Sequence, residues 1–341
     1  MTPLLDFRSD TRTAPDRAMR AAMAGAEVGD DAYGDDPRVL ELEAAGARLL
    51  GKEAALFLPS STMANLVAVL AAAPAPGTRL LTGAETHLAR MEGEGVRRFA
   101  RVELVELAQR DDGAPEPAAL AGALRAGAGR PGVLSLENTC MLHHGNALAP
   151  ADLAPLVELG RAHGCPVHLD GARLANAAVA LGLPVAELAA PADSVTFCLA
   201  KGLGAPVGSL LCADADFVAR ARELRLQLGG TMHQSGVLAA AALEGLERLD
   251  RLAEDHAVAA ALAEGLASVP GARVPRPPRR TNIVTVKLAG VDAGDLHERL
   301  ADRGVLVLPL PDGNVRFVVH REHRPQAVPL VVRALAEAAI Q

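Results

Sequence analysis

The chain has 341 residues, which is enough for one large α/β domain and a smaller one. Hydrophobic residues make up 50% of it and aromatic residues only 2%, so alanine, leucine and valine must fill the core. A formal net charge of −7 gives no electrostatic reason to expect nucleic acid or an anionic membrane as a partner.

The sequence carries no pattern of export or of a membrane span. Charged residues stand at Asp6, Arg8 and Asp10, where a signal peptide would need an apolar segment. No apolar run approaches the ~20 residues that cross a bilayer. The cysteines lie far apart without C-x-x-C spacing, so we expect them to be reduced and buried in a cytoplasmic protein.

Strand and helix patterns alternate along the first 200 residues. In chain order, helices are expected over 15–25, 38–50, 63–73 and 150–164, and strands over 54–58, 79–82, 102–107, 133–137 and 167–170. A further helix is expected to begin at His87, although a lone histidine there is usually a surface or capping residue. The alternation predicts a mainly parallel sheet with its site at the carboxyl ends of the strands.

Three hydroxyl residues, Ser60, Ser61 and Thr62, join the strand over 54–58 to the helix that follows. Free N–H groups and the helix dipole at such a position favour a bound anion. Ordinary helix capping explains the same residues without any ligand. The stretch therefore allows a phosphate site without requiring one.

Two further candidates follow later strands. Asp170 ends the strand over 167–170, and Lys201 ends an apolar, β-branched run with Gly202 and Gly204 directly behind it. Lysine is rare in this chain, where arginine supplies nearly all of the positive charge, and an amine in such a place can form a Schiff base with a carbonyl. The alternative is a surface lysine at a strand end.

The glycines after Lys201 do not form a dinucleotide-binding motif. The apolar run over 207–212 predicts a returning strand, whereas that motif requires a helix there. Helical patterns follow over 217–228 and 235–266, and then a proline-rich break over 270–278. The last part predicts a smaller α+β domain, with strands over 283–288, 305–309 and 315–320, a helix over 293–303 and a final alanine-rich helix. We expect an N-terminal segment over 1–35, a large domain over 36–250 and a small domain over 251–341.

A helix N-terminus, a carboxylate at a strand end and a lysine, in this order along the chain, are what a pyridoxal phosphate enzyme needs. The amine of Lys201 would bind the cofactor, Asp170 would hold its ring nitrogen protonated, and the turn at Ser61 and Thr62 would hold its phosphate. Each feature alone is weak, but together they favour this cofactor.

Motifs along the whole chain resemble those of the low-specificity L-threonine aldolases. The matching stretches are Asp6–Thr11, Val28–Pro37, Gly51–Phe57, His168–Arg173, Phe197–Ser209, Gly229–Met232 and Val315–His320. The resemblance implies the aspartate-aminotransferase-like fold, known as fold type I, and cleavage of β-hydroxy-α-amino acids to glycine and an aldehyde. It also implies a homotetramer, a dimer of dimers, with sites at the dimer interface.

The resemblance implies a role for each residue that matches a family motif. Lys201 resembles the lysine that binds pyridoxal phosphate, Asp170 the partner of its ring nitrogen, and His87 an imidazole stacked on its ring. Ser9, Arg173 and Arg316 match residues that bind the substrate carboxylate, and Arg173 also belongs among those close to the cofactor. A planar guanidinium suits this task because it can bind a carboxylate through two hydrogen bonds. A surface salt bridge is the alternative for both arginines.

Four departures from the family pattern cluster around the expected site. Ser61 stands where the family has glycine, Cys140 replaces a histidine, and His233 replaces an arginine. The loop over 124–133 contains no histidine, although many members carry a second active-site histidine there. Altered substrate range is therefore possible.

Two rival functions also stay open. One is another pyridoxal phosphate reaction, such as β-elimination or racemisation, and the other is a cofactor-binding protein without catalysis.

Overall fold

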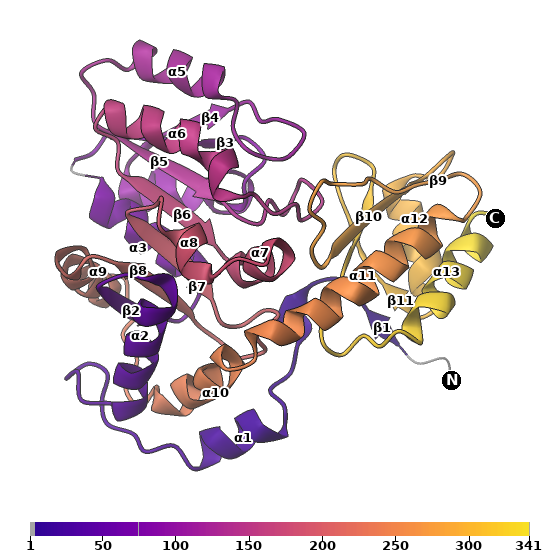
Figure 1. The fold of residues 1–341 in the computed structure, drawn as a ribbon, viewed down its shortest axis with the longest axis horizontal. Coiled ribbons are helices and arrows are strands. Elements are labelled where there is room, and N and C mark those ends of the chain that lie inside the picture. Colours follow the sequence, from indigo (N-terminus) through magenta and orange to yellow (C-terminus); the bar gives the residue numbers. More distant parts are fainter. Residues whose placement is uncertain (1–3, 74, 341) are drawn as a thin grey trace.

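The computed structural model describes residues 4–73 and 75–340, and a seven-stranded sheet lies at the centre of the larger body (Figure 1). Across the sheet the strands lie in the order β2 (Ala54–Leu58), β8 (Ser209–Ala213), β7 (Ser194–Cys198), β6 (Val167–Gly171), β5 (Gly132–Glu137), β3 (Arg79–Gly83) and β4 (Glu103–Leu107). Strand β8 runs antiparallel to both β2 and β7, and the other neighbouring pairs of the described sheet are parallel. The expected mainly parallel α/β sheet is confirmed.

Alternation along the strands explains why helices cover both faces of this sheet. In β2, Phe57 faces a core that includes helix α2 (Pro37–Leu50), whereas Leu56 and Leu58 face a core with α3 (Ser61–Ala72) and α9 (Ala215–Gln227). The core of the first face also contains residues of α5 (Pro117–Ala126), α6 (Pro150–Ala162), α7 (Leu174–Leu181), α8 (Val185–Ala189) and α10 (Gly236–Leu246). Burial on both faces accounts for the continuous apolar runs in these strands.

A second core lies at the other end of the molecule (Figure 1). It surrounds a four-stranded antiparallel sheet in the order β12 (Leu308–Pro309), β13 (Val315–Val318), β10 (Ile283–Leu288) and β9 (Ala272–Arg273). Helices α11 (Leu252–Ala267), α12 (Ala293–Ala301) and α13 (Ala327–Ala338) pack on it. Strand β1 (Leu5–Asp6) pairs in parallel with β11 (Val305–Leu306), and Phe7 is buried in this second core. The start of the chain therefore belongs with its last third.

Helix boundaries follow the capping residues that the sequence supplies. Helix α2 has Asp36 as its N-cap and Pro37 in its first turn, and it ends at Gly51 in the left-handed conformation. Helix α3 begins at Ser61, two residues earlier than expected, because the Ser60 hydroxyl accepts a hydrogen bond from the Met63 amide at 3.1 Å. Helix α1 (Arg17–Ala24) lies between β1 and α2 in the chain.

Other differences from the sequence prediction concern short elements. The helical stretch over 235–266 is interrupted by a 3₁₀ turn, Leu249–Arg251, and another 3₁₀ turn covers Asp10–Arg12. The expected strand over 305–309 divides into β11 and β12, which join different sheets. Two-residue strands carry too little alternation for a sequence pattern to show them.

The stretch after β7 returns as a strand, as expected. Leu199 donates a hydrogen bond to the Gly208 carbonyl at 3.0 Å, and β8 then runs back antiparallel to β7. Gly208 has a positive φ of 111°, and a Cβ there would lie 2.4 Å from the ring of Phe57. Only glycine therefore fits this close approach.

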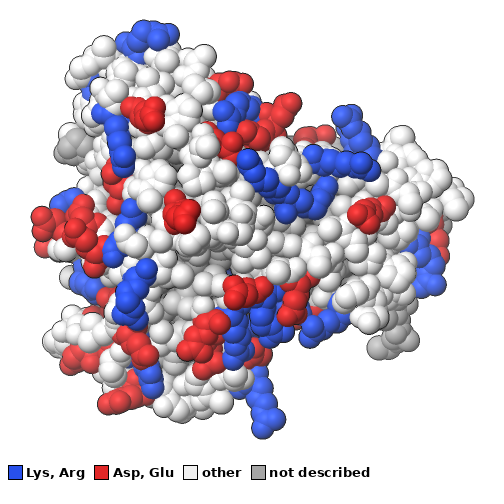
Figure 2. All heavy atoms as spheres, in the orientation of Figure 1, with Lys and Arg blue, Asp and Glu red and all other residues white. Residues whose placement is uncertain are grey.

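The surface carries mixed charge. On the face shown in Figure 2, Lys and Arg are interspersed with Asp and Glu rather than gathered into one field of a single sign. Within residues 4–73 and 75–340, no helix has the length and apolar character needed to cross a membrane.

Candidate active site

Asp170 lies at the carboxyl end of β6, in the middle of the central sheet. Its side chain is buried, with 2% of its surface exposed. One carboxylate oxygen accepts from the Ala172 amide at 3.0 Å, and the other accepts from Asn65 Nδ2 at 2.9 Å. A buried carboxylate with its donors in place is suited to hold a cationic group of a ligand.

Lys201 lies three residues beyond β7, the strand next to β6, in a loop that the N-terminal segment holds. Its carbonyl accepts from the Thr13 hydroxyl at 2.8 Å and from the Gly204 amide at 2.8 Å. The side chain is half-buried. Lys201 therefore follows the end of its strand rather than ending it, and its backbone is fixed from both sides.

A buried ion pair joins Asp10 to Arg173. Two guanidinium nitrogens donate to the two Asp10 oxygens at 2.8 and 2.7 Å, and Asn282 Nδ2 lies 3.1 Å from one of them. Burial alone would raise the pKa of Asp10, but the charges of Arg173 and Lys201 outweigh it and hold that pKa below its ordinary value. Asp10, which the sequence analysis did not select, therefore occupies much of the fork of Arg173.

Arg316 has different surroundings. It lies on β13 and is buried, and it donates one hydrogen bond to the Arg8 carbonyl at 3.2 Å. Its Nε is buried without a hydrogen-bond partner within the described part of the chain. Burial and the nearby charge of Arg173 lower its pKa to about 10, so Arg316 is still a cation at neutral pH. A buried cation without a carboxylate partner is suited to bind an anionic ligand.

Ser9 lies between Arg8 and Asp10 in the chain. Its hydroxyl caps the 3₁₀ turn over Asp10–Arg12 by accepting from the Thr11 amide at 3.2 Å. The structure thus gives Ser9 a local capping role close to Asp10, and the hydroxyl is half-exposed.

His87 stands at the start of a π-helical turn, Leu88–Glu92, after β3. The Glu137 carboxylate accepts from the His87 amide at 2.5 Å and from the Met141 amide at 2.8 Å. The imidazole Nδ1 lies 3.0 Å from Glu92 Oε1. Burial lowers the pKa of His87, but Glu92 and the charges of Asp170 and Glu137 outweigh it, so this pKa lies above the ordinary histidine value.

The pKa of Glu137 is also shifted by its surroundings. Burial and the charge of Asp170 raise its pKa to about 7. Glu92 and Glu137 were not singled out from the sequence. The one available signal was their position, since Glu137 ends β5 and Glu92 lies five residues after His87.

The N-terminus of α3 opens towards the same end of the sheet. The Ser60 hydroxyl is engaged as N-cap, and the Ser61 hydroxyl lies 3.3 Å from that of Ser209 on β8. Thr62 is exposed in the first turn. The first N–H groups of a helix have no partners inside it, so this turn presents donors to an anion.

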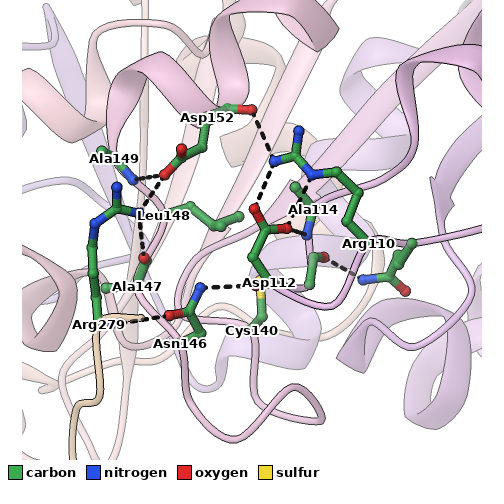
Figure 3. Close-up of polar contacts among 12 residues, drawn as sticks. Arg110, Asp112, Ala114, Cys140, Asn146, Ala147, Leu148, Ala149, Asp152 and Arg279 are labelled. Atoms are coloured by element: carbon green, nitrogen blue, oxygen red, sulfur yellow. Dashed lines mark hydrogen bonds and ion pairs between the residues drawn. The ribbon is translucent and has the colours of Figure 1, made fainter. Parts of the chain in front are cut away.

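The loop after β5 carries Cys140 and connects the two bodies (Figure 3). Burial raises the pKa of Cys140 well above its ordinary value, so the group at this position is a neutral thiol. Asn146 Oδ1 accepts from the Arg279 amide at 3.0 Å, and Arg279 also pairs with Asp152 at 2.6 Å. Arg279 lies just before β10, so the loop is fixed to the smaller sheet.

Two histidines of this loop were also missed. His144, with a positive φ of 60°, lies 2.7 Å through Nδ1 from the Thr285 hydroxyl on β10. Thr285 is the direct cross-strand neighbour of Arg316. Burial lowers the pKa of His143 and of His144. The His144 side chain therefore lies beside the strand pair that carries Arg316.

The groups present fit pyridoxal phosphate. A buried carboxylate at Asp170 suits a ring nitrogen, and the amine of Lys201 follows the neighbouring strand. The N-terminus of α3 suits a phosphate, and the unpartnered Nε of Arg316 suits the carboxylate of an amino acid. Around a central, mainly parallel sheet with a smaller antiparallel domain, these features define a pyridoxal phosphate-dependent enzyme of fold type I.

Comparisons with known proteins narrow the class. Residues 6–289 match the family described as beta-eliminating lyase. Low specificity L-threonine aldolase of Escherichia coli (strain K12) is 41% identical over 321 residues, which cover 93% of this chain and 94% of that protein. Low-specificity L-threonine aldolase 1 of Arabidopsis thaliana is 39% identical over 327 residues, which cover 93% and 91%. The chain belongs to the low-specificity threonine aldolases within the beta-eliminating lyase family, and it is a pyridoxal phosphate-dependent lyase.

Solved structures share the fold. Leishmania major threonine aldolase has a TM-score of 0.83 at 20% identity, with 98% of this chain and 99% of that chain covered. Sphingomonas wittichii serine palmitoyltransferase has a TM-score of 0.79 at 19% identity, with 99% and 86% covered. The likeness extends over both bodies, so the fold-type expectation is confirmed.

Proposed function

We propose that this enzyme cleaves L-threonine, L-allo-threonine and other β-hydroxy-α-amino acids to glycine and an aldehyde. The observation that carries the proposal is that the site contains both a buried carboxylate, Asp170, and a buried cation, Arg316, whose Nε has no hydrogen-bond partner among the described residues. The first suits the cofactor ring, and the second suits the carboxylate of an amino acid. The names of the curated relatives agree with this substrate class.

Each site residue has a task in this proposal. Lys201 would hold pyridoxal phosphate through its amine, and Asp170 would hold the ring nitrogen as a cation. Ser61 and Thr62, with the N-terminal turn of α3, would hold the phosphate. Bound there, the cofactor supplies an electron-accepting ring that stabilises negative charge at the substrate Cα.

The remaining residues bind and orient the amino acid. Arg316 would bind its carboxylate directly, whereas Arg173 would act with Asp10 bound to its fork, next to Ser9. His87 would stack on the cofactor ring, and it would accept the β-hydroxyl proton through Nε2, directly or through a water. Loss of that proton accompanies cleavage of the Cα–Cβ bond and release of the aldehyde.

A product assay separates this function from its rivals. The purified holoenzyme is incubated with L-threonine, L-allo-threonine and β-phenylserine, and glycine and aldehyde are both quantified. Equal amounts of glycine and aldehyde are expected. An α-keto acid with ammonia would indicate β-elimination, a D-amino acid would indicate racemisation, and no product with any substrate would favour a cofactor-binding protein. Lys201→Ala is the control and should release no aldehyde.

We also propose a cytoplasmic homotetramer with sites at a dimer interface, and a division into segments 1–35, 36–250 and 251–341. Tyr33 and Leu226 support an interface, because 84% and 65% of their surfaces are exposed on the single chain. An apolar groove lined by Leu49, Val179 and Val185 adds to this. Light scattering of the holoenzyme tests the assembly, and a monomer at working concentration would contradict it.

A further inference from the structure

Asn65 lies at the centre of the buried polar groups, although nothing in the sequence marked it. It is on α3, one turn after the N-terminal Ser61, and none of its surface is exposed. Its Nδ2 lies 2.9 Å from Asp170 Oδ2 and 3.1 Å from Glu92 Oε2. One amide group therefore contacts two carboxylates, one beside the proposed cofactor ring and one beside His87.

The direction of each hydrogen bond made by Asn65 and His168 follows from the chemistry of the two partners. Ionised carboxylates only accept, so the amide atom facing them must be the NH₂ group. The Asn65 carbonyl oxygen then faces His168 Nε2 at 3.2 Å, and that nitrogen must donate. Burial lowers the pKa of His168 to about 4, so its ring is neutral and its Nδ1 accepts from the Ser194 hydroxyl at 2.9 Å.

The chain continues from Glu92 to the imidazole of His87. The second Glu92 oxygen lies 3.0 Å from His87 Nδ1, and a carboxylate so close favours a proton on that nitrogen. His87 Nε2 is then the nitrogen left to accept a proton. A histidine held in one tautomer by a carboxylate is a better-defined base than a free one.

We propose that Asn65 is a positioning residue for the lyase reaction. Held by His168 and Ser194 on one side, its amide fixes Asp170 and Glu92 on the other, so one side chain orients both the ring-nitrogen partner and the carboxylate behind His87. This inference rests on the proposed function for its catalytic meaning. The hydrogen-bond geometry that it invokes belongs to the protein alone.

Two variants test the inference. Asn65→Leu keeps the branched outline and the number of heavy atoms of the side chain and removes its donors, and Glu92→Gln keeps the shape and removes the charge. Thr78→Val is the matched control, because Thr78 is fully buried and its hydroxyl donates to the local Ala75 carbonyl, outside the network of Asn65. The His87 pKa is measured by NMR titration with and without pyridoxal phosphate, the resonance being assigned as the one lost in His87→Phe.

In the wild type and in the control we expect the His87 pKa above the ordinary histidine value. In both test variants it should fall by on the order of one pH unit, because the negative charge beside Nδ1 is removed or less well held. In the holoenzyme, kcat should fall roughly tenfold or more, the acid limb of its pH profile should move to lower pH, and KM should stay near the wild-type value.

The possible results separate the positioning role of Asn65 from the proposed function. A folded Asn65→Leu protein with unchanged His87 pKa and unchanged pH profile overturns the inference even if the enzyme is an active aldolase. If Asn65→Leu does not fold, an unchanged His87 pKa in Glu92→Gln overturns it. If the wild type releases no glycine but the pKa falls in both variants, the proposed function is wrong and the positioning network stands.

Discussion

The residues proposed for the chemistry lie at or after the carboxyl ends of the strands. Asp170, Glu137 and His87 follow or end three neighbouring strands, β6, β5 and β3. From the sequence, Asp170 was expected at a strand end because a strand pattern leads up to it, and the structure has it there, whereas His87 was selected through the family resemblance. The sequence could not show Glu92 or Asn65, because their importance arises from contacts with residues far along the chain.

Replacing Asp170 by asparagine tests its role. The neutral amide cannot hold a ring nitrogen in its cationic form, so Asp170→Asn should retain pyridoxal phosphate but lose most turnover. A charge-assisted hydrogen bond is worth roughly 1.5–3 kcal/mol, which corresponds to a fall in kcat of about 10- to 150-fold. Cofactor content by absorbance and kcat with β-phenylserine measure the two effects. Near-normal turnover would remove this role from Asp170.

Replacing His87 by phenylalanine separates stacking from proton transfer. Phenylalanine keeps an aromatic face and removes both nitrogens, so cofactor affinity should change little while kcat falls by about 10²- to 10⁴-fold. Steady-state kinetics with β-phenylserine and cofactor titration give the two numbers. If the variant cleaves this substrate at close to the wild-type rate, His87 is not the base.

At the level of elements, α3 and the N-terminal segment do most to assemble the site. Helix α3 supplies the expected phosphate turn and, one turn later, Asn65. The N-terminal segment supplies Asp10 for Arg173, the Arg8 carbonyl for Arg316, and Thr13 for the Lys201 loop. The long elements were predictable from periodicity and caps, as α2 shows with Asp36 and Gly51. The strands β1 and β9 were not predictable, and the expected strand over 305–309 did not show its division into β11 and β12, because a two-residue strand is defined by its partner and not by a pattern of its own.

The two arginines should respond differently to truncation. Arg316→Ala removes a cation with no carboxylate partner, so KM should rise by about 10- to 150-fold for the loss of roughly 1.5–3 kcal/mol, with a smaller effect on kcat. Michaelis kinetics measure this effect. An unchanged KM would exclude Arg316 from carboxylate binding.

Arg173→Ala should instead affect folding as well as binding. It leaves Asp10 buried without its partner, and breaking a buried pair costs about 3–5 kcal/mol. The melting temperature should therefore fall clearly below that of Arg316→Ala. The double variant Asp10→Asn, Arg173→Ala should recover part of the loss, and equal melting temperatures for the two single variants would argue against the buried pair.

For the molecule as a whole, helix α11 carries a pH-dependent group. Burial, with the charges of Asp10 and Glu254, raises the pKa of Asp255 to about 7. Between its ordinary pKa and about 7 the folded state binds more protons than the unfolded state. The free energy of unfolding therefore falls as the pH rises through this window.

Asp255→Asn should remove this dependence. Relative to the wild type, the variant should be more stable at pH 8 by at most roughly 4 kcal/mol, and the difference should disappear near pH 4. Differential scanning calorimetry across this range measures it. Glu264→Gln, an exposed residue near the other end of the same helix, is the control and should leave the curve unchanged. Parallel curves for wild type and Asp255→Asn would refute the assignment.

The pairing of β1 with β11 also bears on how the enzyme is made. The register joins Leu5 to Val305, 300 positions further along the chain, so β1 can pair only after β11 has been synthesised. Contacts so distant in sequence form late, since the intervening chain must order first. Arg8 follows β1 closely in the chain, so the hydrogen bond from Arg316 to the Arg8 carbonyl forms together with this strand pairing. The strands of the central sheet all precede β11 in the chain, so this sheet can form before Arg8 is brought to Arg316.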